Sequence, residues 1–133
     1  MADATTQVEL TVFADSTTRA EPDPVGIGAG GSLRYNLCFE GSQPAADPAQ
    51  ISILFVGFQP LGRSAPEPVD ARRGPFAEII RAGNSITGRD AAGRAGHYGY
   101  KVLRSELGGG ETVLPWRNSL RGFGGVDVGG RPP

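Results

Sequence analysis

Short alternating runs of apolar residues, separated by frequent glycines and prolines, most restrict how this chain can fold. Gly and Pro account for 21 and 11 of its 133 residues, which leaves little room for a long uninterrupted helix. Apolar side chains recur at every second position in QVELTVFAD (residues 7–15) and SLRYNLCFEG (residues 32–41), which predicts two strands that each bury one face. The nearly continuous apolar run ISILFVGF (residues 51–58) predicts a central strand covered on both faces.

Turn signals divide the rest of the chain into further short strands. Residues 76–88 predict one strand, two strands around Gly83-Asn84, or a short helix over 76–82. Additional strands are expected at residues 97–106, 111–116 and 125–128. A total of about seven short strands favours an all-β fold, a single antiparallel two-sheet sandwich with long Gly/Pro-rich loops. We expect one domain over residues 1–133, with residues 1–6 and 129–133 flexible.

A glycine-rich stretch, VGIGAGG, raises the question of nucleotide binding. Gly26, Gly28 and Gly31 match the spacing G-x-G-x-x-G. A dinucleotide loop needs a helix directly after these glycines, because the helix N-terminus binds the pyrophosphate. The following residues have the period of a strand, and the preceding residues 16–24 are acidic and proline-rich, as in an exposed loop. The glycines therefore predict a turn or a bulge that leads into a strand.

Few residues of the chain have side chains that commonly bind metals or act as catalytic nucleophiles and bases. A copper site in a sandwich protein takes two histidines and a cysteine, whereas this chain has one histidine, His97, and one cysteine, Cys38. Cys38 and His97 would form a nucleophile and its base only if the fold brought them together. The alternative is an inert thiol and a histidine at the rim of the sheet. We therefore expect a non-catalytic protein without a metal or another cofactor.

The segment GRAGHYGYKV carries a family resemblance. Gly96, Tyr98 and Tyr100 form a G-x-Y-x-Y pattern at the start of a late strand. The pattern resembles that of cupredoxin-like and immunoglobulin-like sandwich domains, and it implies a β-sandwich in which Tyr98 makes a corner with the preceding connection, near Asp90. The chain departs from these families because it lacks the copper ligands and the cysteine pair. The resemblance therefore implies a fold and no particular chemistry.

Charge is unevenly distributed along the chain, although the net charge is only −1. Residues 1–60 hold seven acidic residues and two arginines, whereas residues 61–133 hold eleven basic and seven acidic residues. This asymmetry indicates either two oppositely charged faces or a basic patch for an acidic partner. The near-neutral total does not predict nucleic-acid binding. Arg supplies 12 of the 13 basic residues, which is typical of a GC-rich, bacterial genome.

Two loops are candidates for binding a protein partner. They span residues 59–75 and 114–125, and arginine and tryptophan are enriched in binding hot spots. The candidate residues are Arg63, Arg72, Arg73, Trp116, Arg117 and Arg121. Trp116 alternatively fills the core of the sandwich.

The function predicted from these features is that of a protein-binding or self-assembling module, an adaptor or a structural subunit. Self-association would proceed through an edge strand. The alternative is a small enzyme or enzyme inhibitor whose site is built around Cys38 and His97. The chain shows no signal peptide and no apolar run long enough to span a membrane, so a cytoplasmic location is expected.

Overall fold

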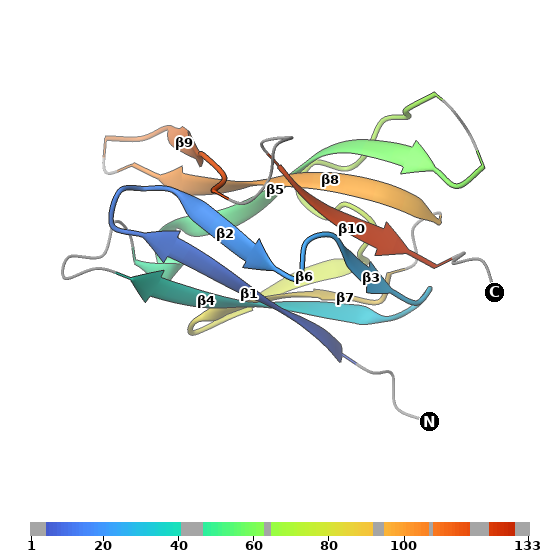
Figure 1. The fold of residues 1–133 in the computed structure, drawn as a ribbon, viewed down its shortest axis with the longest axis horizontal. Coiled ribbons are helices and arrows are strands. Elements are labelled where there is room, and N and C mark those ends of the chain that lie inside the picture. The colour runs from blue at the N-terminus through green and yellow to red at the C-terminus, as the bar shows by residue number, and fades with distance from the viewer. Residues whose placement is uncertain are drawn as a thin grey trace.

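Two β-sheets pack face to face in the computed structural model of the chain (Figure 1). The structure describes residues 5–40, 47–62, 65–91, 95–106, 108–117 and 123–129. The first sheet has the strand order β2-β1-β4-β7-β6 and consists of β1 (Thr5–Phe13), β2 (Thr18–Glu21), β4 (Ser32–Glu40), β6 (Glu78–Ala82) and β7 (Ser85–Arg89). The second has the order β3-β10-β8-β5, with β9 also paired to β8, and consists of β3 (Val25–Ile27), β5 (Ile51–Pro60), β8 (Gly96–Ser105), β9 (Glu111–Leu114) and β10 (Gly124–Val128). A single 3₁₀ turn, η1 (Pro48–Gln50), precedes β5.

The expected all-β sandwich is confirmed, but its sheets are mixed and not purely antiparallel. β1 and β4 pair in parallel, and so do β10 and β3. The reason lies in residues 16–31, where the sequence predicted an exposed loop and a turn. They contain β2, which folds back on β1, and β3, which joins the other sheet. The chain leaves the first sheet before it returns in β4, so β4 can run parallel to β1.

The glycine-rich stretch leads into a strand, as the spacing predicted. Gly26 lies within β3, and Gly30 has a φ of 78° in the turn that follows. The turn is held by two hydrogen bonds, from the Gly30 N–H to the carbonyl of Ala91 and from the Ala91 N–H to the carbonyl of Gly31. No helix follows among the described residues, because β4 begins at Ser32. The stretch therefore lacks the helix N-terminus that a dinucleotide loop requires.

β5 is an edge strand, so the prediction of a central strand covered on both faces is wrong. Of the strands that the structure describes, it pairs with β8 alone, and its buried residues alternate, as Ile51, Ile53 and Phe55 show. Part of its open edge is covered by the loop that follows it. The Phe55 N–H donates to the carbonyl of Ala71, and the Glu67 N–H donates to that of Phe58, both at 2.8 Å. One function of this loop is therefore to protect an edge.

The segment around Gly83-Asn84 is a β-hairpin, which confirms the two-strand prediction and shows the helix over residues 76–82 to be wrong. Gly83 has a φ of 58° and Asn84 has no positive φ, as expected of a type II′ turn with glycine first. Ala82 and Ser85 close the turn as the first pair of the β6–β7 ladder.

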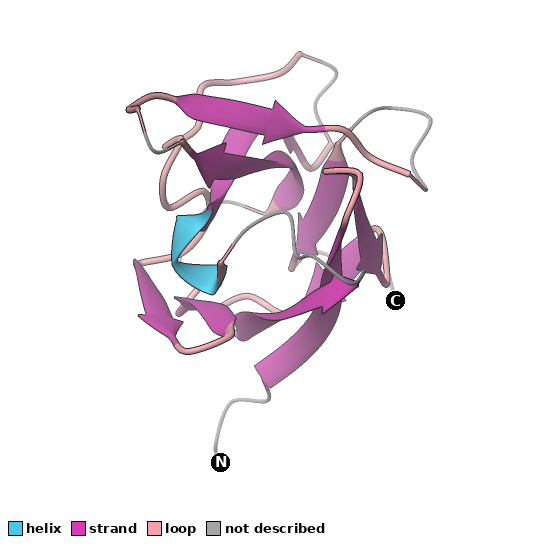
Figure 2. Cartoon of the chain, turned by 90° about the vertical axis from the view of Figure 1, so that its left-hand side faces the viewer, coloured by secondary structure: helices cyan, strands magenta, loops and turns pink. Residues whose placement is uncertain are grey.

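The core lies between the two sheets (Figure 2). Inward-facing residues of β1 and β4 meet those of β8 and β10, and Tyr35 contacts Tyr100 edge to face with ring centroids 5.2 Å apart. Tyr98 stacks on Phe58 at 4.3 Å. The motif glycine Gly96 is required here, because a Cβ on it would lie 2.3 Å from the carbonyl oxygen of Gln59. Thr5 and Thr6, expected to be flexible, belong to β1, whereas residues 1–4 and 130–133 lie outside the described residues.

Candidate protein-binding edge

β6 forms an open edge of the first sheet. Among the described strands it pairs only with β7, and the hairpin determines which of its backbone groups bond to β7. Ala82 is hydrogen-bonded across the turn, so Ile80 and Glu78 also face β7, whereas the N–H and C=O groups of Ile79 and Arg81 point away from it. Across the described ranges, no residue hydrogen-bonds to these outward groups. β6 therefore presents a row of unused donors and acceptors.

A groove runs beside this edge, between β6 of the first sheet and β5 of the second. Its volume is about 340 Å³, and it is lined on its apolar part by Ile53, Leu54, Ile79, Ile86 and Leu103. The η1 turn lies at the edge between the two layers (Figure 2), and the Arg81 guanidinium donates a 2.8 Å hydrogen bond to the carbonyl of Pro48 in this turn. The open edge thus continues into a partly apolar groove.

Two arginines border the groove. Arg72 and Arg81 both line it, and within the part of the chain that the structure describes neither forms an ion pair. The neighbouring Arg73 and Arg89 are engaged, with Asp70 at 3.4 Å and Glu78 at 3.5 Å. The acidic residue Glu111 also lines the groove, at the start of β9.

A local turn positions Arg72. The Asp70 carboxylate accepts hydrogen bonds from the backbone N–H groups of Arg73 and Arg72, both at 2.9 Å, and these bonds hold the pKa of Asp70 below its usual value. Gly74 continues the turn with a φ of 55°, and its N–H donates to the carbonyl of Asp70. The sequence DARRG thus forms an Asx-type turn that leads the chain past the groove.

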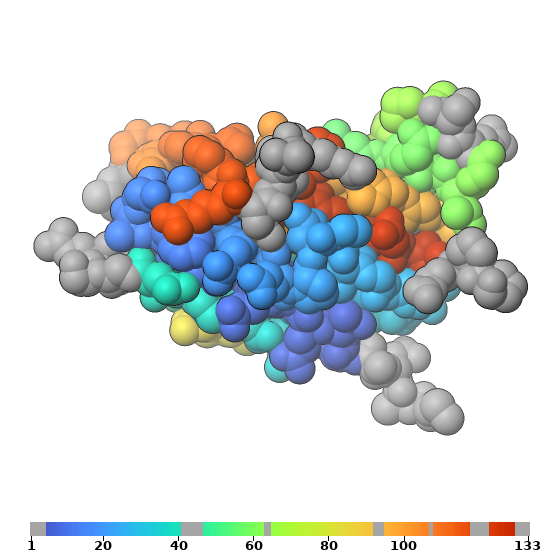
Figure 3. Space-filling view, in the orientation of Figure 1, coloured from blue at the N-terminus to red at the C-terminus, as the bar shows by residue number. Residues whose placement is uncertain are grey.

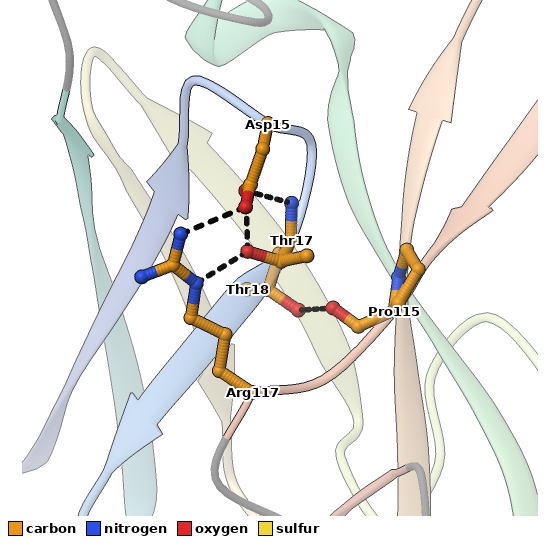
Figure 4. A network of polar contacts seen from close by, with 5 residues as sticks. All are labelled: Asp15, Thr17, Thr18, Pro115 and Arg117. Atoms are coloured by element: carbon orange, nitrogen blue, oxygen red, sulfur yellow. Dashed lines mark hydrogen bonds and ion pairs between the residues drawn. The ribbon is translucent and has the colours of Figure 1, made fainter.

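Trp116 and Arg117 lie at the opposite edge of the first sheet. Trp116 is partly buried and contacts Tyr100 edge to face at 5.6 Å, which favours its role as a core residue. Arg117 binds within the chain (Figure 4): its guanidinium donates to Asp15 at 2.9 Å and to Thr17 at 2.6 Å. In Figure 3 the orange segment that contains β9 lies directly against the blue β1–β2 hairpin.

Backbone hydrogen bonds also join the segment after β9 to β2. The N–H of Thr18 donates to the carbonyl of Pro115, and the N–H of Arg117 donates to the carbonyl of Thr18, both at 2.8 Å. Hydrogen bonds from the side chain and the backbone of Thr17 lower the pKa of Asp15, with a smaller contribution from Arg117.

Among the predicted binding residues, Arg63 and Arg121 lie outside the described residues. The structure does not gather the others into one surface, and their binding role stays a prediction.

Cys38 and His97 are not brought together. Cys38 is on β4 of the first sheet and His97 on β8 of the second, and each points away from the core that separates the sheets. Burial and the carboxylates of Glu9 and Glu40 raise the pKa of Cys38, which disfavours the nucleophilic thiolate. The pair therefore lacks the adjacency that a nucleophile and its base require.

His97 pairs with Asp127, a contact that the sequence did not predict. Their Nδ1 and Oδ1 atoms lie 2.6 Å apart on neighbouring strands. The other ring nitrogen, Nε2, is buried against Gly125 and has no hydrogen-bond partner among the described residues. A wide groove of about 1000 Å³ opens beside this pair, and residues of the glycine-rich stretch line it. With Nε2 covered, the imidazole does not present a base to this groove.

Comparison of the sequence with protein-family models and with curated proteins finds no match. No helix in the described part of the chain has the length and apolarity that crossing a membrane takes. Within the same ranges, no three His, Cys, Asp or Glu side chains come together as a metal site would require. The outward backbone groups of β6 and the adjacent groove make this edge the best-defined candidate site. Of the predicted residues, it includes only Arg72; Ile79 and Arg81 were not anticipated.

Proposed function

We propose that the chain is a non-catalytic β-sandwich module that binds protein by accepting an additional strand at β6, in an adaptor or a structural subunit. The observation that carries this proposal is the row of outward backbone groups at Ile79 and Arg81, beside an apolar groove. Strand addition uses such groups for affinity and the adjacent pocket for specificity.

The other edges support strand addition less well. The outer side of β2 is partly occupied, because Thr18 of this strand forms a β-bridge with Trp116. The open edge of β5 is partly covered by the loop that follows it. β3 has three residues and β9 has four, whereas β6 has five and borders the apolar groove. Exposed edges without protective features pair readily with another chain. The added strand comes either from a different protein or from a second copy of this chain.

A matched pair of variants tests the proposal. Ile79→Ala removes the side chain but keeps the outward N–H, whereas Ile79→Pro removes both. Proline is tolerated at an edge position whose N–H faces solvent, so both variants should fold. Molar mass would be measured by light scattering across a concentration series, and protein capture would be measured from an extract of the source cells.

We expect the wild type and Ile79→Ala to self-associate or to retain a partner protein, and Ile79→Pro to do neither. The proposal is wrong if Ile79→Pro associates as the wild type does. It is also wrong if none of the three proteins associates in either assay.

A further inference from the structure

We infer that the strand accepted at β6 belongs to another protein and is acidic, with apolar and carboxylate side chains alternating on the face that covers the groove. This inference rests on the proposed function and names the chemistry of the partner. It follows from the two arginines that line the groove and from the additional arginines that a second copy of the chain would place there.

The backbone of β6 determines where the side chains of an added strand lie. The partner strand would hydrogen-bond to Ile79 and Arg81, and its side chains would alternate between the two faces of the sheet. Ile79 lines the groove, so every second side chain of the partner would cover the groove on that same face. Apolar side chains at these positions would contact Ile53 and Leu54, which are part of the lining.

The charges of the groove favour carboxylates at the remaining inward positions. Arg72 and Arg81 come from two different segments and lie around the same space. Both lack an ion pair among the described residues, and Glu111 is the one acidic residue among the described residues of the lining. An incoming carboxylate would gain charge-assisted hydrogen bonds from these guanidinium groups, for which their planar shape is well suited.

The same charges disfavour a second copy as the occupant. In a symmetric antiparallel pairing of two β6 strands about Ile80, Arg81 of each copy would lie opposite Ile79 of the other. The inward faces of both copies would then join, and two Arg72 and two Arg81 side chains would gather over one extended groove. Four like charges gathered at one groove repel one another and oppose this pairing. An acidic partner removes this conflict.

Two synthetic peptides test the inference. The acidic probe has the sequence Thr-Val-Thr-Glu-Thr-Val-Thr-Glu, and its twin carries Lys in place of each Glu. Binding would be followed from the amide NMR signals of Ile79 and Arg81 in the wild type, and from that of Arg81 in Ile79→Pro, because proline has no amide proton. We expect the acidic peptide to bind about tenfold more tightly than its twin, to weaken with added salt, and to lose binding to Ile79→Pro.

Charge reversal provides the control. The double variant Arg72→Glu/Arg81→Glu should prefer the lysine peptide. The matched variant Arg73→Glu/Arg89→Glu has the same change in net charge outside the groove and should keep the acidic preference.

The possible failures are distinguishable. If both peptides bind equally and Ile79→Pro abolishes binding, the acidic partner is wrong and strand addition stands. The acidic partner is also wrong, and strand addition also stands, if neither peptide binds but the chain self-associates through a contact that Ile79→Pro abolishes. If Ile79→Pro changes nothing, or if no association of any kind occurs, both the inference and the proposed function are wrong.

Discussion

The guanidinium carbon of Arg117 lies 3.6 Å from the centroid of the Phe13 ring, although the two residues are far apart in the sequence. The same guanidinium donates to Asp15 and Thr17 in the turn that follows Phe13 (Figure 4). One arginine thus combines a cation–π contact with charge-assisted hydrogen bonds. It fastens the segment after β9 to the β1–β2 hairpin of the other sheet.

We predict that Arg117→Ala lowers the free energy of unfolding by about 1 kcal/mol, because it removes the cation–π contact and both hydrogen bonds. Urea denaturation followed by tryptophan fluorescence measures the change. Arg73→Ala is the matched control, because Arg73 forms only an exposed ion pair with Asp70 and should have little effect. Equal stability of the two variants would contradict the role assigned to Arg117.

A second prediction concerns two buried hydroxyl groups. Tyr35 and Tyr100 are 2% and 0% exposed, and within the described residues neither hydroxyl forms a hydrogen bond of ordinary geometry, although each hydroxyl affects the pKa of the other. An unsatisfied buried hydroxyl destabilises the fold, so Tyr35→Phe should leave stability unchanged or raise it by up to about 1 kcal/mol. Leu10→Ala, at an equally buried position, should cost about 2–5 kcal/mol. Thermal and urea unfolding of both variants provide the comparison, and a large loss for Tyr35→Phe would show that its hydroxyl is satisfied.

The same tyrosines predict a loss of stability in alkali. Burial raises the pKa of both Tyr35 and Tyr100 in the folded chain. As pH rises above about 10, the unfolded chain releases phenolic protons that the folded chain retains, so the free energy of unfolding falls. The free energy of unfolding of the double variant Tyr35→Phe/Tyr100→Phe should fall less steeply over the same pH range. Urea midpoints at a series of pH values test this, and parallel curves for the two proteins would refute it.

Gly96 gives a prediction about the family-like motif. A Cβ at this position would collide with the Gln59 carbonyl, and its φ of 152° is one that side chains rarely adopt. Gly96→Ala should therefore cost about 2 kcal/mol or more. At Gly26 a Cβ would meet nothing within 4 Å, so Gly26→Ala should change stability by less than about 0.5 kcal/mol. Similar midpoints for the two alanine variants would contradict this account of Gly96.

The sequence predicted the strands more completely than their arrangement. The alternation around Leu33, Tyr35 and Leu37 depends only on local burial, and it correctly indicated β4. It could not show that β1 runs parallel to β4, because this depends on β2 and β3, two short strands within residues predicted to be a loop and a turn. The apolar run at residues 51–58 suggested a central strand covered on both faces, but the sheet order places β5 at an edge, and Val56 on its outer face is 44% exposed.

The candidate site was less accessible to prediction. The Gly83-Asn84 signal indicated a hairpin, yet which of its strands becomes an edge is decided by contacts with β4, distant in the sequence. Arg72 was selected because arginines are common at interfaces, and its position beside Arg81 depends on the packing of two sheets. Resemblance at Gly96, Tyr98 and Tyr100 agrees with a sandwich, while membership of a cupredoxin-like or immunoglobulin-like family stays a prediction.

Amide hydrogen exchange along β6 tests strand addition most directly. In the isolated chain the amides of Ile80 and Ala82, which face β7, should exchange slowly, whereas those of Ile79 and Arg81 should exchange rapidly. Saturation with the acidic peptide, or with a captured partner, should slow exchange at Ile79 and Arg81 selectively and remove the alternation. Binding that leaves both amides in rapid exchange would contradict the addition of a strand at this edge.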